Sequence, residues 1–431
     1  MDEFGPMMSG GRERAAHSPL LSVTALLCSV VLLVFGTNLQ GVLLPIRLQL
    51  DGASMARVGL LSSGWSVGFM LACLSVGRLV TAVGHVRTFA ALAALSGSTA
   101  LLMLPLQQPP AWIALRVVIG FCYGGLALII ESWLNERATR SARGGIFAAY
   151  MTANLVASLA GTLSFTRLDP RGPMPFVVMV AAVVMSIVPV ALTRSPVPKP
   201  TRPFSIHLGE LFAISPSGVS GCFAAGLVSG AVGGLGPTFG LAMGLSTHQV
   251  ALMLAGTVLG GALSYYPAGR LSDRMDRRFL LLGLSALAIA ACAVLVLRGA
   301  TLSPGWLMLT VSAFGFAQYP LYGLCVAFVN DRIRERSFAE TASELLLTFA
   351  AGTVLGPIAG ALAMAHDAAN LFVFVAAVLA LESAYIVWRL VHFPSPVANA
   401  AKPRETFKAT PGSMSVLKSR SRPATTDTAP H

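Results

Sequence analysis

Charged residues are scarce in this sequence, and their scarcity excludes a water-soluble protein. Asp, Glu, Lys and Arg together make up 11% of the 431 residues, whereas a soluble domain contains about 25%. The apolar residue types make up 55%, and the mean hydropathy is +0.73. Lipid is therefore the main solvent of this chain, and we expect a polytopic membrane protein.

The sequence also lacks the residue spacings that mark disulfides, metal sites and catalytic centres. Its six cysteines lie inside apolar stretches with no CxxC pair, and its seven histidines are scattered over loops, helix ends and tails. Cysteines in such positions are typical core residues. No nucleophile, base and orienting group occur together at a meaningful spacing. We expect neither an enzyme nor a bound cofactor or metal ion.

Acidic residues are outnumbered by basic ones, 18 to 30, which gives a net charge of +12. The basic residues fall between apolar runs and do not form one basic face, so nucleic acid is not the expected partner. Anionic headgroups of the lipid bilayer fit this distribution better.

Apolar stretches of the length that a transmembrane helix needs, about 20 residues, occur twelve times. Their approximate ranges are 20–46, 57–79, 88–106, 111–134, 145–166, 174–193, 216–240, 248–271, 279–298, 304–329, 341–364 and 370–391. Backbone groups in lipid have to be hydrogen-bonded within the chain, which favours helices. We therefore expect an all-α membrane protein with twelve transmembrane helices.

An even number of helices places both ends of the chain on one side of the membrane. The loops on that side contain fifteen basic residues: Arg78, Arg87, Arg137, Arg140, Arg143, Arg194, Lys199, Arg202, Arg270, Arg274, Arg277, Arg278, Arg332, Arg334 and Arg336. The opposite loops contain five, namely Arg47, Arg57, Arg167, Arg171 and Arg298. Basic residues accumulate in cytoplasmic loops. We therefore expect a multi-pass protein of the plasma membrane, the inner membrane of a bacterium, with both termini in the cytoplasm.

An internal repeat divides the helices into two groups of six. At shifts of 192 and then 195 residues the aligned positions include Pro45 with Pro237, Gly68 with Gly260, Gly77-Arg78-Leu79 with Gly269-Arg270-Leu271, Gly120 with Gly315, Asn135-Glu136-Arg137 with Asn330-Asp331-Arg332, and Gly161 with Gly356. Two parallel six-helix halves, related by an axis along the membrane normal, are typical of secondary transporters.

The segment between the halves, from Thr193 to Pro203, contains four prolines, which prevent a helix and favour an extended linker. After His392 the composition becomes too polar for a core. The expected organisation is a cytoplasmic N-terminal segment (1–19), an N-terminal six-helix bundle (20–193), a cytoplasmic linker (194–215), a C-terminal six-helix bundle (216–392) and a disordered basic cytoplasmic tail (393–431).

The loop at 269–278 reads Gly-Arg-Leu-Ser-Asp-Arg-Met-Asp-Arg-Arg, and with it the chain resembles the major facilitator superfamily over residues 20–392. The family signature in this loop is GxxxDRxGRR, and Asp276 stands at the place of its last glycine. The corresponding loop of the first half keeps the glycines but has Thr81 in place of the acid. The resemblance implies that Asp273 contacts the start of the fifth helix when the cytoplasmic side is closed. Alternatively, the arginines of the loop serve only to set topology.

The end of the fourth helix, Glu131-Ser-Trp-Leu-Asn-Glu136, is similar to the YcaD-type branch of the superfamily. Arg78 ends the second helix on the same side of the membrane. One interpretation is that Arg78 pairs with Glu131, which then substitutes for the acid that the first-half loop lacks. The other is that Glu131 is an interfacial carboxylate that reaches water. Together with Asp273 and Arg274, these two residues form the expected set of gating residues.

Arg116 lies about five residues inside the fourth helix, or about 8 Å from its start. A charge within a span is costly and marks a functional candidate. The stretch from Arg116 to Gly120 resembles the family motif RxxQGxG, with Ile119 in place of glutamine. The alternative is that the side chain extends to the outer membrane surface.

The family resemblance places helices 1, 4, 7 and 10 around a central cavity. It implies a set of candidate substrate contacts: Arg116, Asn38, Tyr123, Asn154, Gln318 and Tyr322. For each polar residue taken singly, interhelical hydrogen bonding is the commoner role. Glu382, the only acid well inside a span, lies on the peripheral twelfth helix, where a packing or interfacial role is expected.

These features predict a secondary active transporter that moves a small solute across the plasma membrane by alternating access. Proton-driven efflux of amphipathic compounds is an alternative, and a membrane sensor or scaffold without transport is a minor one. We expect a monomer whose partners are a small-molecule substrate, the lipid bilayer and, if transport is coupled to it, a proton. The sequence identifies neither the solute nor the direction of transport.

Overall fold

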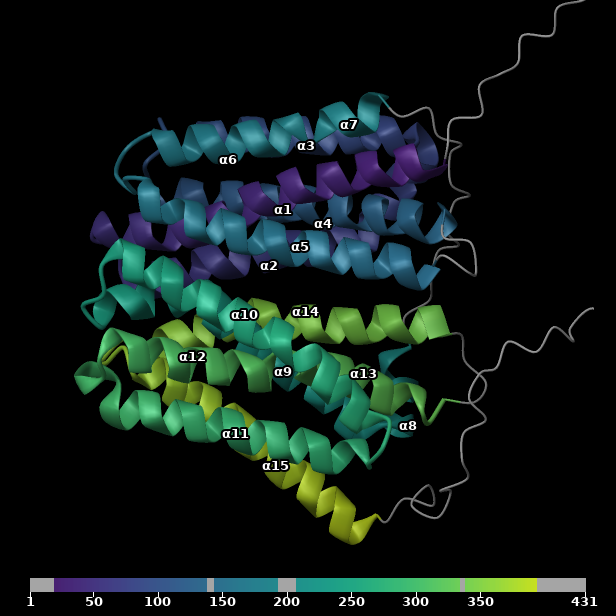
Figure 1. The fold of residues 1–431 in the computed structure, drawn as a ribbon, viewed down its shortest axis with the longest axis vertical. Helices are drawn as coiled ribbons and strands as arrows, with labels where there is room; N and C mark the ends of the chain where they lie inside the picture. Colours follow the sequence, from purple (N-terminus) through teal and green to yellow (C-terminus); the bar gives the residue numbers. More distant parts are fainter. Residues whose placement is uncertain (1–18, 138–142, 193–206, 334–337, 394–431) are drawn as a thin grey trace, which may run out of the picture. The chain divides into compact units, whose positions relative to one another are not determined.

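The computed structural model describes residues 19–137, 143–192, 207–333 and 338–393, and helices account for nearly all of them. The first half contains α1 (Pro19–Leu50), α2 (Met55–Val83), α3 (His85–Leu102), α4 (Pro109–Arg137), α5 (Arg143–Ser164), the 3-10 turn η1 (Phe165–Arg167), α6 (Met174–Met185) and α7 (Ile187–Leu192). The second half contains α8 (Leu208–Ile214), α9 (Pro216–Ala242), α10 (Thr247–Ser272), α11 (Arg277–Arg298), the 3-10 turn η2 (Gly299–Thr301), α12 (Pro304–Gln318), α13 (Pro320–Asn330), α14 (Phe338–Ala363) and α15 (Asn370–His392). Figure 1 shows the helices of the first half in purple to blue beside those of the second half in green to yellow.

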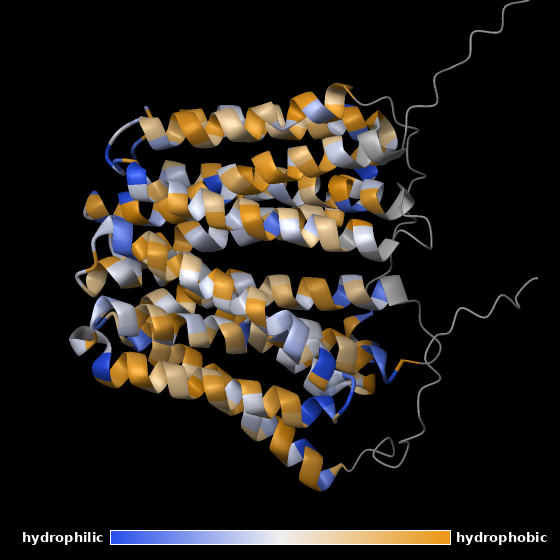
Figure 2. Ribbon diagram, viewed as in Figure 1, coloured by the Kyte–Doolittle hydropathy of each residue, from blue (hydrophilic) through white to orange (hydrophobic). Residues whose placement is uncertain are grey.

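The helices agree with the twelve that the sequence predicts. In the described part of the chain, ten segments are long and apolar enough to cross a membrane, and two of these are the pairs α6 with α7 and α12 with α13. The other two predicted spans are α3 and α5, which carry more small and polar residues. Helix α3 packs against α4 and α6, and α5 packs against α1 and α10. Apolar residues make up most of each helix, and many hydrophilic ones lie at helix ends and loops (Figure 2).

Two predicted helices are each broken in the structure. One span is divided at Ser186 into α6 and α7, and another at Tyr319 into α12 and α13. A proline follows each break, Pro189 in the first case and Pro320 in the second. Proline has no backbone N–H to continue the helical ladder, and its ring crowds the preceding turn. The breaks therefore have a local cause in the sequence.

Glycines at equivalent positions bring helix backbones into contact in the same way in both halves. A Cβ atom on Gly68 of α2 would overlap the Val117 carbonyl oxygen of α4, and one on Gly260 of α10 would overlap the Ser312 carbonyl oxygen of α12. Ser312 is the repeat equivalent of Val117. The same correspondence holds for Gly120 against Trp65 and Gly315 against Thr257, and for Gly161 against Phe35 and Gly356 against Leu227. The two six-helix halves are thus pseudo-symmetric copies.

The halves contact each other toward one end of the helices. We call the end where α1 stops and α2 begins the distal end, and the end where α1 begins and α2 stops the proximal end. Ser62 Oγ on α2 donates to the Gly234 carbonyl oxygen on α9 at 3.1 Å. Ser63 Oγ donates to the Val354 carbonyl oxygen on α14 at 2.7 Å. Both hydrogen bonds lie in the distal part of α2 and join the two halves.

Three glycines at the proximal end of the same helices have no close neighbour. Gly77 near the end of α2, Gly145 near the start of α5 and Gly269 near the end of α10 have nothing within 4 Å of the position that a Cβ atom would take. Gly77 and Gly269 lie near the ends of α2 and α10, beside the loops in which the family resemblance expects contacts between the halves. Gly145 lies at the start of α5, where the resemblance places the partner of Asp273. Among the described residues, the side-chain hydrogen bonds that join the two halves thus lie in the distal part of α2.

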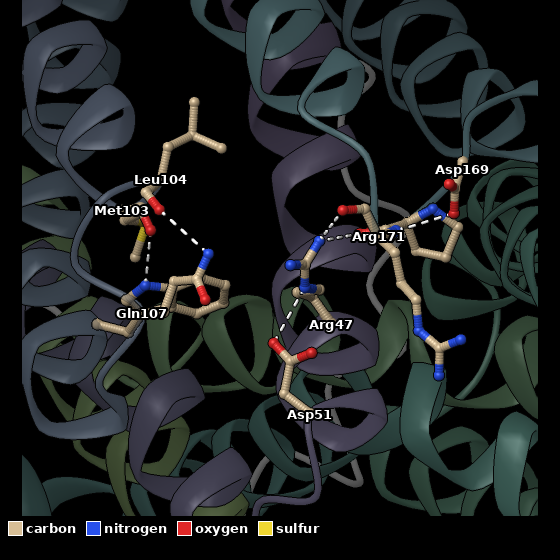
Figure 3. A network of polar contacts seen from close by, with 9 residues as sticks. Arg47, Asp51, Met103, Leu104, Gln107, Asp169 and Arg171 are labelled. Carbon is tan, nitrogen blue, oxygen red and sulfur yellow. Dashed lines mark hydrogen bonds and ion pairs between the residues drawn. The ribbon is translucent and has the colours of Figure 1, made fainter.

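Arg47 at the distal end of α1 holds the loop between α5 and α6 (Figure 3). Its Nε lies 3.0 Å from Asp51 Oδ2, and its Nη1 donates to the carbonyl oxygens of Pro170, at 3.0 Å, and of Arg171. Asp169 Oδ1 accepts from the Arg171 backbone N–H at 2.9 Å and closes this loop. One guanidinium thus links the end of α1 to the segment that leads into α6.

Replacing Arg47 with alanine is expected to lower the melting temperature of the purified protein by at least about 2 °C. The substitution removes an ion pair and two hydrogen bonds to a charged donor, which contribute about 1.5–3 kcal/mol each before solvent screening. Differential scanning fluorimetry in detergent measures the change. Arg57→Ala is the matched control, because Arg57 is an exposed arginine at the same end of the bundle. Equal losses in the two variants would contradict the role of Arg47.

Candidate functional site

Arg116 on α4 is buried, with 7% of its surface exposed. Its Nη1 donates to Gln40 Oε1 on α1, and Gln40 is buried as well. The Arg116 Nε has no hydrogen-bond partner, and in the described part of the chain no carboxylate forms an ion pair with this guanidinium. The side chain thus lies between α1 and α4 and does not extend to the outer surface. A buried cation without a counter-charge is costly.

Asn38 and Gln318 are hydrogen-bonded to neighbouring helices. Asn38 Oδ1 accepts from Ser158 Oγ on α5 at 2.8 Å, and Asn38 Nδ2 donates to the Val34 carbonyl oxygen at 2.9 Å. Gln318 Nε2 donates to Ser229 Oγ on α9 at 2.6 Å. These bonds join α1 to α5 and α12 to α9, as polar residues inside a bundle commonly do. A solute reaches either amide only by replacing or extending such a bond.

Asn154 on α5 bonds within its own helix, where its Nδ2 donates to the Tyr150 carbonyl oxygen at 3.1 Å. It is half-buried, and so are Tyr123 and Tyr322. The structure therefore leaves Asn154 apart from the amides that join neighbouring helices.

Aromatic rings gather around both candidate tyrosines. On α4, the Tyr123 ring centroid lies 5.4 Å from that of Trp65 and 6.5 Å from that of Phe69, both on α2. On α13, the Tyr322 ring centroid lies 4.6 Å from that of Phe349 on α14. The buried Trp65 Nε1 has no hydrogen-bond partner. The rings around Tyr123 thus belong to the first half, and the Tyr322–Phe349 pair belongs to the second half.

Glu131 on α4 is exposed and accepts a hydrogen bond from the Tyr150 hydroxyl at 3.3 Å. Arg78 is exposed at the proximal end of α2, and the described residues show no ion pair between the two. The alternative of an Arg78–Glu131 pair is therefore not realised in this conformation. Tyr150, which the sequence analysis passed over, holds the carboxylate instead.

Asp273 and Arg274 are exposed at the end of α10. No hydrogen bond or ion pair joins the Asp273 side chain to the part of α5 that the structure describes. The two residues stay predicted gating residues for a conformation in which the proximal end is closed.

Asp276 departs from the family signature for a local structural reason. Its Oδ1 accepts from the Arg278 backbone N–H at 2.9 Å and caps the start of α11. The equivalent residue before α3 is Gly84, whose φ of 93° is in the left-handed region that favours glycine. The two halves therefore begin their third helices by different means, one with a side-chain cap and one with a glycine turn.

Arginines of the second half are held at the proximal end. Arg277 Nη1 forms an ion pair with Asp331 Oδ2 at 3.2 Å, which joins α11 to the end of α13. The Arg332 guanidinium carbon lies 3.6 Å from the centroid of the Phe328 ring. Burial, followed by the neighbouring charge of Arg278, lowers the pKa of Arg332 to about 10. Arg332 therefore stays charged at pH 7.

Glu382 on α15 accepts a hydrogen bond from Ser220 Oγ on α9 at 3.0 Å. It is half-buried and joins the last helix to its neighbour. This geometry agrees with the packing role expected from the sequence.

Sequence reasoning missed the partners of the polar residues rather than the residues themselves. Gln40, Ser158, Ser229 and Tyr150 each satisfy a candidate side chain from another helix. A polar residue within an apolar run was the available signal for all four. Which helix each one faces depends on packing, which the run does not encode.

A model of the Major Facilitator Superfamily matches residues 26–216 and 218–425. The chain is 27% identical over 386 residues to an uncharacterized MFS-type transporter of Enterobacter sp. (strain 638), a match that covers 88% of this chain and 98% of the relative. It is 25% identical over 385 residues to the uncharacterized MFS-type transporter YcaD of Salmonella arizonae, with the same coverage of both chains.

Two solved structures show the same fold at low sequence identity. A mutant of the nucleoside transporter NupG superposes with a TM-score of 0.74 at 11% identity, covering 86% of this chain and 99% of that one. A bacterial homolog of the human lysosomal transporter Spinster, in an inward-facing and occupied conformation, superposes with a TM-score of 0.62 at 16% identity, covering 86% of this chain and 94% of that one.

Removing the cap of α11 by Asp276→Ala is expected to destabilise the protein by about 0.5–2 kcal/mol. Asp276→Asn, which keeps a capping oxygen, is expected to cost much less. Thermal melting of the two purified variants beside the wild type measures the difference. If the asparagine variant were as unstable as the alanine variant, the charge of Asp276 would matter more than its capping bond.

Proposed function

The chain belongs to the Major Facilitator Superfamily and is a secondary transporter in a multi-pass membrane fold, and on this premise we propose that residues 20–193 and 216–392 move as two bodies about a solute site between them. Glycines at equivalent positions bring the helices within each half into close contact. In the described part of the chain, the side-chain hydrogen bonds between the halves come from two serines at the distal end. Few such bonds have to break when the distal end opens.

We assign the proximal end to the cytoplasm of a bacterium, with the protein a monomer in the inner membrane. Fifteen basic residues in the proximal loops, against five in the distal loops, support this orientation. The conformation is then open inward and closed outward. The similarity to a Spinster homolog described as inward-facing is in keeping with this assignment.

We propose that Arg116 binds an anionic or strongly hydrogen-bonding group of the solute. The observation that carries this proposal is the buried guanidinium with an unpartnered Nε and Gln40 as its hydrogen-bond acceptor. A solute anion would supply the missing counter-charge, and a guanidinium binds planar anions well. Asn38, Tyr123, Asn154, Gln318 and Tyr322 are the further proposed contacts.

We further propose that closure of the proximal end brings Asp273 and Arg274 against the start of α5, and Arg78 against Glu131. The exposed position of all four residues in the inward-open conformation leaves them available for these contacts. Their pairing would stabilise the outward-open state, because a carboxylate at a helix N-terminus is favourable.

Arg116→Ala is expected to weaken binding of an anionic ligand by at least about tenfold. A panel of small carboxylates and phosphates is screened first for compounds that raise the melting temperature of the purified wild-type protein. The compounds that do so are then titrated against the variant. Arg298→Ala, which removes an exposed arginine at the distal end, is the control with unchanged binding. Unchanged binding and transport by a well-inserted Arg116→Ala protein would remove the proposal.

Asp273→Asn is expected to increase the population of the inward-open state, because the neutral side chain interacts more weakly with the start of α5. Reporter cysteines at Gly77 and Leu60, in a background without Cys28 and Cys73, sample the proximal and distal ends. Labelling by an impermeant maleimide should rise at the proximal reporter and fall at the distal one. An unaltered labelling pattern would count against a gating role for Asp273.

A further inference from the structure

Trp65 and Phe69 lie on the face of α2 that contacts the second half. The contact itself is made by Ser62, whose Oγ donates to the Gly234 carbonyl oxygen of α9 at 3.1 Å. Positions three and seven residues further along a helix lie on the same face, and these positions hold Trp65 and Phe69. Both rings therefore border the seam between the halves, on the proximal side of the Ser62 contact.

The Tyr123 ring of α4 packs with these two rings. The ring centroids of Trp65 and Phe69 are 5.5 Å apart, with an angle of 19° between the ring planes. The Tyr123 centroid lies 5.4 Å from that of Trp65 and 6.5 Å from that of Phe69. We call Trp65, Phe69 and Tyr123 the aromatic cluster. All three residues are half-buried, so part of each side chain stays accessible at the seam.

Arg116 lies beside the aromatic cluster. A Cβ atom on Gly64, the chain neighbour of Trp65, would lie 3.8 Å from Arg116 Cβ, and one on Gly120 would lie 2.9 Å from Trp65 Cα. Trp65 thus packs on the turn of α4 that begins at Arg116. Along the helix axis, Arg116 is about 6 Å to one side of Gly120 and Tyr123 is about 4.5 Å to the other. The charge and the rings therefore occupy neighbouring levels of one helix pair.

Two buried hydrogen-bond donors in this region have no partner. They are Arg116 Nε and Trp65 Nε1. Gln40 Oε1 accepts from Arg116 Nη1 and leaves Nε unpartnered. An unpaired buried donor is costly, and a carboxylate carries two oxygens that accept such bonds. An acid group placed here would remove the cost, and the rings would contact the body of the same molecule.

We propose that the solute is an aromatic carboxylate. Its carboxylate binds Arg116 and accepts from Trp65 Nε1, and its ring packs with Phe69 and Tyr123. This inference rests on the proposed binding of an anionic group at Arg116, and it names the class of molecule that carries the group. Ring pairs contribute to affinity beyond the burial of apolar area. The aromatic cluster therefore discriminates among acids of equal charge.

Benzoate and cyclohexanecarboxylate are the probes, because both carry one carboxylate on a six-carbon ring and only one ring is aromatic. Each is titrated against the purified full-length protein at constant ionic strength, with calorimetry and melting temperature as measurements. We expect benzoate to bind saturably below about 10 mM and at least about threefold more tightly than cyclohexanecarboxylate. Benzamide, which keeps the ring without the charge, should bind at least about tenfold more weakly than benzoate.

Two kinds of variant separate the donor from the rings. Trp65→Phe keeps a ring and removes Nε1, so it is expected to weaken both acids about tenfold and to keep the preference for benzoate. Phe69→Leu and Tyr123→Leu keep both donors and remove a ring face, so they are expected to weaken benzoate alone and to lower the preference. If Trp65→Phe does not melt cooperatively, the two leucine variants decide the question.

Trp133→Phe is the matched control. Trp133 is also a buried tryptophan whose Nε1 has no partner, but its ring packs with His85 and Phe89, at centroid distances of 5.7 Å and 6.4 Å. The control variant should bind both acids as the wild type does. A loss confined to Trp65→Phe then comes from the place of Trp65 beside Arg116, and not from the removal of an indole N–H in general.

Four results would overturn the inference. They are equal affinity of the wild type for the two acids, an unchanged preference in both leucine variants, unchanged affinities in a folded Trp65→Phe protein, and an equal loss in Trp133→Phe. Binding of other anions that depends on Arg116, without binding of benzoate, would also overturn it and leave the proposed anion site standing. If no anion showed binding that depends on Arg116, the proposed function itself would fail.

Discussion

Hydrocarbon offers no water to a polar group, so each polar atom inside this protein needs a partner from the chain itself. The structure meets this requirement with bonds from side chains to carbonyl oxygens one turn back in the same helix, and with bonds between neighbouring helices. Asn38 bonds to Ser158, Gln318 to Ser229 and Glu382 to Ser220, and each bond joins two helices. The serines that join the two halves obey the same rule, with backbone carbonyls as acceptors. Some buried polar atoms of the described residues, among them Arg116 Nε and Trp65 Nε1, have no hydrogen-bond partner.

Arg116 and Glu131 are two charged residues of α4 with few partners. Arg116 is buried with one amide oxygen as its partner, and Glu131 is exposed at the seam with one phenol as its donor. Neither charge is neutralised by another described side chain. A structural role would be served by neutral residues at lower cost. The two charges also differ in access, since Arg116 is buried and Glu131 is exposed.

Duplication explains the shared geometry of the two halves, and local substitutions explain where they differ. The glycine contacts of α2 with α4 recur between α10 and α12. The loops after α2 and α10 have diverged, because Gly84 makes a left-handed turn where Asp276 caps a helix. A proline breaks α12 from α13, and the equivalent helix α4 continues without a break. The central helices of the second half are therefore less regular than those of the first.

The sequence by itself determined the membrane location, the twelve helices and the duplication, because these depend on composition, on the length of apolar runs and on spacing along the chain. It also identified Arg116 and Glu131 as unusual, since a charge within an apolar run is visible without a structure. Only the tertiary structure decided that Arg116 is buried against Gln40, that Glu131 bonds to Tyr150 rather than Arg78, and that the halves meet at the distal end. The physical reason is that helix periodicity does not determine which neighbour a polar side chain faces. That choice depends on the rotation and crossing of each helix against the others, and here glycines set those crossings through contacts between residues far apart in the sequence.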